Sequence, residues 1–100
     1  MSILETHSKE LKKACDQYRV KSLYAFGSVL SDHFTEESDI DLLVEFNRDS
    51  YEGAFEQYFG FKEELERIFS RNVDLVCYRA IRNPYFKQEV DGTKRELYAA

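Results

Sequence analysis

The segment from Gly27 to Asp41, which reads GSVLSDHFTEESDID, constrains this chain more than any other part of it. A Gly-Ser pair is followed by ten residues and then by Asp39 and Asp41, which open the apolar run DLLVEF. Alternate residues of a strand point to the same face, about 6–7 Å apart, so the two carboxylates are predicted to lie side by side. Such like charges repel unless a cation lies between them. The pattern therefore predicts a divalent-metal site at the start of a buried strand.

A third carboxylate, Asp74, lies within another apolar, strand-like run. Burying a carboxylate without a partner is costly, and a metal ion is one such partner. Mg²⁺ binds through a few carboxylates and leaves its other positions to water and phosphate, whereas zinc prefers His and Cys. Cys15 and Cys77 form no metal-binding pattern with each other or with a histidine. Asp39, Asp41 and Asp74 are therefore candidate ligands of magnesium.

The pair Gly27-Ser28, the ten-residue gap, the pair Asp39 and Asp41 and the later Asp74 resemble the minimal nucleotidyltransferases, the small single-domain branch of the DNA polymerase β-like superfamily. The resemblance implies an α/β (α+β) nucleotidyltransferase fold, with a small mixed β-sheet covered on one side by helices. It also implies that the Gly-Ser turn binds the phosphates of a nucleotide. The three aspartates would be catalytic and would hold two Mg²⁺ ions.

The resemblance covers the chain from about Leu23 to Tyr85 and extends to function. Members transfer nucleotides, and many are antitoxins that adenylylate a small helical partner of the HEPN class. The similarity implies that this chain moves a nucleoside monophosphate, AMP from ATP, to a hydroxyl of such a partner. Members often carry an Arg and a Gly shortly after the Gly-Ser pair, whereas this chain has the tripeptide LSD there.

Charge bears on what the chain binds. The formal net charge is −5, and no block of Lys and Arg forms a basic stripe, which argues against a nucleic-acid substrate. Arg79 and Arg82, or Lys94 and Arg95, are candidates to contact the triphosphate in place of the missing arginine. Each is otherwise an ordinary surface charge.

Other interpretations stay open from the residues alone. Asp74 could form an ion pair with Arg71 or Arg79, and Ser28 could be a plain helix cap. A non-catalytic antitoxin would keep the fold and neutralise its partner sterically. A transferase acting on a small molecule would turn over without a protein partner.

Length and composition bound the remaining possibilities. The 100 residues predict one domain, residues 1–100, and 43% hydrophobic residues predict a globular fold. No apolar stretch approaches the ~20 residues that span a bilayer, so no membrane segment is expected. Two separated cysteines without a signal peptide predict a cytoplasmic protein. The 15% aromatic content leaves room for a partner surface or a homo-oligomer.

Hydrophobic periodicity and turn residues predict the order of the elements. Ser50 is expected to cap the long helix, and Pro84 to lie in the first turn of a short one. Helices are expected at Ile3–Tyr18, Ser28–Ser31, Tyr51–Phe69 and Asn83–Val90, and strands at Val20–Phe26, Asp39–Phe46 and Asn72–Tyr78, with Leu97-Tyr98 as a last short strand or a packed tail.

Overall fold

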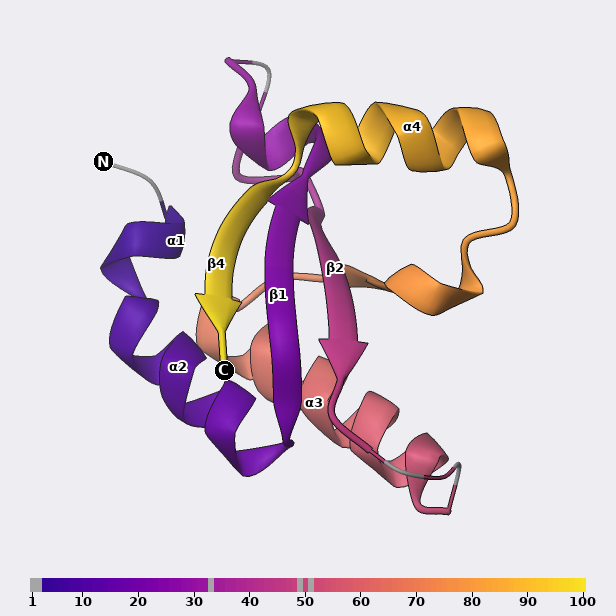
Figure 1. The fold of residues 1–100 in the computed structure, drawn as a ribbon. Coiled ribbons are helices and arrows are strands. Elements are labelled where there is room, and N and C mark those ends of the chain that lie inside the picture. Colours follow the sequence, from indigo (N-terminus) through magenta and orange to yellow (C-terminus); the bar gives the residue numbers. More distant parts are fainter. Residues whose placement is uncertain (1–2, 33, 49, 51) are drawn as a thin grey trace.

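The computed structural model describes residues 3–32, 34–48, 50 and 52–100 (Figure 1). Helices alternate with strands along the chain, as the sequence predicts. The elements are α1 (Ile3–Thr6), α2 (Ser8–Gln17), β1 (Val20–Phe26), the 3₁₀ helix η1 (Gly27–Leu30), β2 (Ile40–Phe46), α3 (Ala54–Phe69), β3 (Val73–Cys77), the 3₁₀ helix η2 (Tyr78–Ala80), α4 (Pro84–Thr93) and β4 (Arg95–Ala99).

The four strands form one mixed sheet in the order β3-β2-β1-β4. β2 and β1 are the two inner strands, and β1 is antiparallel to both β2 and β4. β3 is parallel to β2, because α3 carries the chain back across the sheet between them. The predicted mixed sheet is therefore confirmed, and the tail segment around Leu97 is a true strand.

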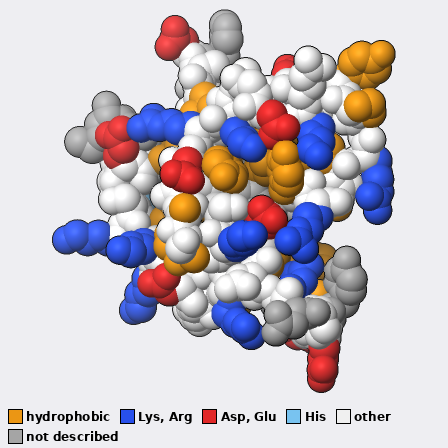
Figure 2. Space-filling model, in the orientation of Figure 1, with side chains coloured by type: hydrophobic (Ala, Val, Ile, Leu, Met, Phe, Trp, Pro, Cys, Tyr) orange, Lys and Arg blue, Asp and Glu red, His pale blue; other side chains and the backbone are white. Residues whose placement is uncertain are grey.

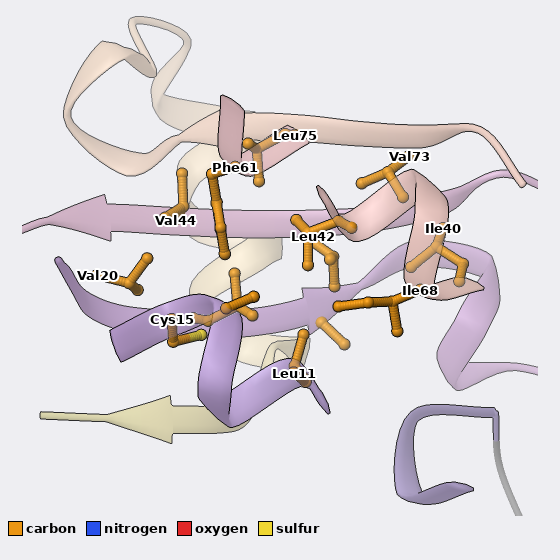
Figure 3. Packing of buried hydrophobic residues seen from close by; sticks show 14 of the residues in the cluster. Leu11, Cys15, Val20, Ile40, Leu42, Val44, Phe61, Ile68, Val73 and Leu75 are labelled. Atoms are coloured by element: carbon orange, nitrogen blue, oxygen red, sulfur yellow. The ribbon is translucent and has the colours of Figure 1, made fainter. Parts of the chain in front are cut away.

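Helices α1, α2 and α3 cover one face of this sheet, and the main core lies between them and the strands (Figure 3). Leu11 and Cys15 of α2 meet Phe61 of α3 over the even-numbered residues of β2, such as Leu42 and Val44. The opposite face is less covered. There α4 crosses one end of the strands (Figure 1).

Contact between α4 and this second face is made by a small separate core of Phe26, Leu43 and Val90. The expectation of helices on one side only thus holds for α1 to α3, and α4 is the exception. Beyond this small core, the sheet face below α4 is open. Charged side chains lie across it around a group of hydrophobic ones (Figure 2).

Three helix boundaries differ from the expectation, and one of them is the end of α4, which lies at Thr93 and not at Val90. The helix predicted from Ile3 to Tyr18 is divided at His7, whose ψ of 20° departs from helical values and whose Nδ1 lies 3.1 Å from Oε1 of Glu10. His has weak helix propensity, and its local bond to a side chain competes with the helix. The chain therefore turns there before α2 begins.

The long helix begins at Ala54, because Gly53 before it adopts a left-handed φ of 74°. Ser50 does not cap it: its Oγ accepts a hydrogen bond of 3.3 Å from the N–H of Glu52, within the preceding turn. Tyr51, the expected first residue, lies outside the described residues. The short helix α4 begins as predicted, with Oδ1 of Asn83 accepting from the N–H of Tyr85 at 2.9 Å.

β3 is an edge strand, and side chains of α3 occupy two of its outward-facing backbone groups. The N–H of Val73 donates to Oε2 of Glu66 at 3.0 Å, and the hydroxyl of Tyr58 donates to the carbonyl of Leu75. None of the described helices has the length and apolar character needed to cross a membrane.

Candidate functional site

The site begins at the sharp turn that ends β1. Gly27 has a φ of +72°, a conformation that glycine adopts without a steric penalty. A Cβ at this position would overlap Oδ2 of Asp41 and lie 3.3 Å from its Cγ. Phe26, just before the turn, is the register partner of Asp41 in the β1–β2 pair. Glycine is therefore required here for its conformation and also for the close approach of the carboxylate.

Ser28 follows within η1, and its backbone N–H donates a hydrogen bond to the carboxylate of Asp41. The helix η1 begins at Gly27, and its N-cap position, Phe26, makes no side-chain cap bond. Ser28 is therefore inside the first turn and is not the helix cap that the sequence left open. The turn thus presents one backbone N–H, that of Ser28, to the carboxylate of Asp41.

Asp74 is the register partner of Asp41 in the parallel β2–β3 pair. Paired residues of adjacent strands point to the same face of a sheet, so both carboxylates lie on the face opposite α3. Asp39 lies one residue before β2 begins. The structure thus places the three aspartates of the sequence motif around one end of β2 and β3.

The exposure of these carboxylates corrects one expectation. Asp74 is not buried, and neither is Asp39, whereas Asp41 is half-buried. The reason is that α3 covers the other face of β3, so that Val73 and Leu75 are buried and the residue between them faces solvent. The cost of burying a carboxylate therefore falls on Asp41 alone.

The electrostatics of Asp41 reflect this arrangement. Burial raises the pKa of its carboxyl above the ordinary value, and the negative charges of Asp74 and then Asp39 raise it further, while the hydrogen bond from the N–H of Ser28 opposes the shift. A cation at this point would relieve the same repulsion. The donor set of three carboxylates also matches the hard oxygen ligands of Mg²⁺.

As the side chains lie, no group of three His, Cys, Asp or Glu residues within the described ranges is close enough to hold a metal ion. The carboxylates therefore fit magnesium in chemistry and in placement on the sheet, but they have not converged. Exposed side chains such as those of Asp39 and Asp74 change rotamer readily.

Asp74 forms an ion pair with neither Arg71 nor Arg79, because both arginines bind other groups. Arg71 donates from Nη1 to the carbonyls of Thr35 and Ser38, both at 3.0 Å. Arg79 forms an ion pair of 3.3 Å with Glu45. Within the described part of the chain, no ion pair joins Asp74 to a cation.

The sequence did not indicate that Arg71 supports the site, although it binds the loop before Asp39. Its guanidinium lies 4.8 Å from the ring centroid of Phe34, in a cation–π contact. It thereby anchors the loop that leads from the Gly27 turn to Asp39. The contacts span 33 and 36 residues of sequence, so no local pattern could have identified them.

The other candidate cations are bound elsewhere. Nζ of Lys94 lies 2.8 Å from Oδ1 of Asp91 and above the rings of Tyr24 and Tyr78, at 4.7 and 4.8 Å from their centroids. Arg95 lies 3.6 Å from Oε1 of Glu5. Arg95 is the register partner of Ala25, two residues before Gly27, so both cations lie near that end of the sheet but are held by these other contacts.

Comparison with known proteins agrees with this geometry. A family model described as a nucleotidyltransferase domain matches residues 8–96. The chain is 44% identical over 89 residues to a Methanocaldococcus jannaschii protein provisionally named a protein adenylyltransferase, a match that covers 89% of this chain and 85% of that protein. It is 30% identical over 82 residues to the protein adenylyltransferase MntA of Thermococcus cleftensis, covering 82% and 77% of the two.

Solved structures share the fold. One described provisionally as a minimal nucleotidyltransferase superposes with a TM-score of 0.77 at 25% identity, over 95% of each chain. A toxin–antitoxin complex with AMP-PNP gives 0.70 at 21% identity, over 93% of this chain and 73% of the other. An MNT antitoxin in complex with tri-AMPylated HEPN toxin of Shewanella oneidensis gives 0.65 at 20%, over 97% and 73%.

The family model spans most of the chain, and the relatives that share at least 30% of its residues are named as enzymes that transfer adenylyl groups. The arrangement of the Gly27 turn beside Asp41 and Asp74 is consistent with that assignment. This chain belongs to the nucleotidyltransferase-domain family and is a nucleotidyltransferase.

Proposed function

We propose that the chain transfers AMP from ATP to a hydroxyl group of a partner protein of the HEPN class and acts as the antitoxin of that partner. The observation that carries this proposal is the position of Asp41, which lies against the Gly27 turn and is paired in register with Asp74. The names of the relatives suggest that the transferred group is adenylyl and that the acceptor is a protein. The toxin–antitoxin complexes that share the fold suggest that the partner is a HEPN protein.

Gly27 and Ser28 bind the phosphates of the nucleotide in this proposal. The space that a side chain on Gly27 would need holds the carboxylate of Asp41, so in this proposal the phosphates bind to the turn beside that carboxylate. The N–H of Ser28, which donates to Asp41 in the structure, lies at the start of η1 in the same turn. Ordered backbone donors of this kind stabilise developing negative charge without reorganisation.

Asp39, Asp41 and Asp74 are the proposed catalytic residues and the ligands of two Mg²⁺ ions. When bound, the ions supply positive charge that offsets the phosphates and the three carboxylates. Asp41 is the fixed ligand, because the N–H of Ser28 and the Gly27 turn hold its carboxylate. Asp39 and Asp74 are exposed, and together with Asp41 they would hold the ions.

The reaction forms a bond between the acceptor oxygen and the α-phosphorus of ATP. The bond from that phosphorus to the oxygen bridging to the β-phosphate breaks, and pyrophosphate leaves. The hydroxyl proton passes to a carboxylate, for which Asp74 is the candidate because it is exposed beside Asp41. Most of the protein's contribution is positioning of the two substrates.

The test is transfer of label from ATP carrying ³²P at the α-phosphate to a purified HEPN protein encoded beside this chain, in the presence of Mg²⁺. We expect labelling of the partner that is lost in Asp39→Asn, Asp41→Asn and Asp74→Asn. Glu63→Gln is the matched control, because Glu63 is an exposed carboxylate of α3 away from the site. It should label the partner at the wild-type rate.

Two results would contradict the proposal. Inhibition of the partner that persists in all three aspartate variants, with no label transferred by the wild type, would indicate a steric antitoxin. Turnover of ATP with a small-molecule hydroxyl, and none with the protein partner, would indicate a different acceptor.

A further inference from the structure

A cavity of about 330 Å³ lies where β2 ends, between that strand, the segment after it and η2. Among the described residues, Arg48, Arg79 and Arg82 line it together with one carboxylate, that of Glu45. These described lining residues carry a net charge of 3 − 1 = +2. The chain as a whole carries −5, so positive charge is concentrated here against the overall balance.

The arginines are held by different contacts. Nη1 of Arg48 donates to Oε1 of Gln57 at 2.8 Å, and its guanidinium lies 5.2 Å from the ring centroid of Phe46. Nε of Arg79 lies 3.3 Å from Oε2 of Glu45, while 73% of its side chain is exposed. Arg48 is thus fixed at the wall of the cavity, and Arg79 presents donors to solvent at its mouth.

This cavity lies at the end of β2 and shares a sheet face with the proposed transfer site only through Glu45, because Val44, Phe46 and Arg48 lie toward α3. Asp41 and Glu45 are separated by four positions of β2, so both point away from α3. At ~3.3 Å per residue they are about 13 Å apart along the strand. In Figure 2, Lys and Arg side chains gather on this face below the hydrophobic group in the middle of the view. Arg79, held at this end by Glu45, therefore does not replace the missing cation at the Gly27 turn.

We propose that Arg48, Arg79 and Arg82 form a docking site for an acidic segment of the protein acceptor, which lies along the open sheet face with its hydroxyl at Asp41. The proposal rests on the transfer function above and names a chemical property of its partner. Arginine is suited to such contacts, because its planar guanidinium binds carboxylates through two parallel hydrogen bonds.

A protein ligand fits this site better than a nucleic acid. The arginines lie at one end of one strand pair, and the chain as a whole is acidic, a charge balance that is unfavourable for binding a phosphate backbone. Complementary charge beside a transfer site also speeds encounter with the correct partner and disfavours others.

The first test measures binding of a fluorescein-labelled oligoglutamate peptide by fluorescence anisotropy. The variant Arg79→Gln/Arg82→Gln should bind it about three- to tenfold more weakly than the wild type, because exposed ion pairs contribute modestly. Lys9→Gln/Lys12→Gln is the matched control: it removes the same charge from exposed positions of α2 and should bind like the wild type. Binding should weaken as salt is added.

Equal weakening in both double variants would overturn the proposal, since it would show a response to overall charge alone. So would an unlabelled single-stranded RNA that displaces the peptide from the wild type and binds more tightly than the peptide does. Neither measurement requires turnover, so the docking site and the transfer function can fail separately.

The second test uses the labelling reaction with the HEPN partner. Arg79→Gln/Arg82→Gln should raise the KM for the acceptor by the same three- to tenfold and leave the KM for ATP unchanged. A raised KM for ATP with an unchanged KM for the acceptor would assign the arginines to the nucleotide and overturn the proposal.

Discussion

The carboxylate of Asp41 occupies the space that a side chain on Gly27 would need. A Cβ added to Gly27 would overlap Oδ2 of Asp41 and lie 3.3 Å from Cγ. The left-handed φ of +72° at Gly27 adds a second constraint on the same residue. The turn and the carboxylate are therefore fixed against each other, so the conformation of the Gly27 turn and the position of Asp41 depend on each other.

Gly27→Ala should abolish nucleotidyl transfer and lower the free energy of unfolding by about 1 kcal/mol or more, because φ is strained and Asp41 is displaced. Gly53→Ala is a matched control, since Gly53 has a φ of +74° but nothing within 4 Å of its added Cβ. It should lose similar stability and keep its activity. Equal activity of the two variants, measured by label transfer, would show that the contact with Asp41 is unimportant.

Two helical glycines should respond to alanine in opposite directions. Gly60 of α3 would place a Cβ 2.7 Å from Cε1 of Tyr18, whereas Gly92 of α4 has nothing within 4 Å. Alanine favours a helix by about 1 kcal/mol over glycine. Gly92→Ala should therefore raise the free energy of unfolding by up to that amount, less near the helix end. Gly60→Ala should lower it by about 1–3 kcal/mol through overpacking.

Urea denaturation of both variants measures this difference. Tyr18 packs on Phe61 with ring centroids 5.9 Å apart, so its ring cannot move away without disturbing the core. The combination Tyr18→Ala/Gly60→Ala should recover part of the loss relative to Tyr18→Ala alone. An increase in stability for Gly60→Ala would show that the ring of Tyr18 yields.

Asp41→Asn should stabilise the protein in EDTA while removing transfer activity. The raised pKa of Asp41 means that its ionisation costs stability as pH rises above the ordinary value of 3.8. Asparagine removes that charge and keeps an acceptor for the N–H of Ser28. The gain should be below about 1 kcal/mol, because the carboxyl is only half-buried. A lower melting temperature in EDTA than the wild type would count against this account.

Arg71→Gln should reduce the transfer rate and destabilise the fold by about 1 kcal/mol, because two backbone carbonyls lose their donor. Arg71→Lys should keep little more of the transfer rate and of the stability than Arg71→Gln does, since an ammonium lacks the planar fork of the guanidinium. The control is Arg67→Gln, whose arginine is exposed on α3 and pairs with Glu64 of the same helix. Hydrogen exchange should accelerate at Thr35 and Ser38 in the Arg71 variants alone.

Tyr98 joins the last strand to α2, since its hydroxyl donates to Oδ1 of Asp16 at 2.6 Å. This hydrogen bond raises the pKa of Tyr98 to about 12. The stabilisation it gives is complete below the ordinary pKa of 10 and is lost as pH rises through about 12. Burial also raises the pKa of Tyr58, and the hydrogen bond with Asp91 raises that of Tyr78, so several tyrosines should titrate late. Ultraviolet titration should show that Tyr98→Phe lowers the amplitude of the step near 12 by one tyrosine and that Asp16→Asn moves that share back toward 10. An unchanged amplitude near 12 in Tyr98→Phe would contradict the assignment.

Much of the fold could be predicted from local pattern. Alternating apolar residues defined β1, β2 and β3 to within a residue or two, and Asn83 with Pro84 identified the start of α4. The breaks at His7 and Gly53 were missed, because one depends on a side-chain bond and the other on a backbone conformation that glycine makes accessible.

The site was predictable only in part. Spacing indicated that the Gly27 turn and Asp41 would lie together, and the structure brings them into contact. The roles of these residues stay predictions. The exposure of Asp74 depends on which face of β3 receives α3, and the anchoring by Arg71 depends on a contact across 33 to 36 residues. Contacts between elements that are distant in the sequence produce no periodic pattern in a single sequence.

The side chains that occupy the outer rim of β3 have a consequence for solubility. With the N–H of Val73 held by Glu66 and the carbonyl of Leu75 held by Tyr58, a strand from a second molecule finds those hydrogen-bonding positions already taken. Sheets that leave such positions vacant act as templates for cross-β fibrils. At high concentration, this chain is thereby protected on that side from growing into an ordered aggregate.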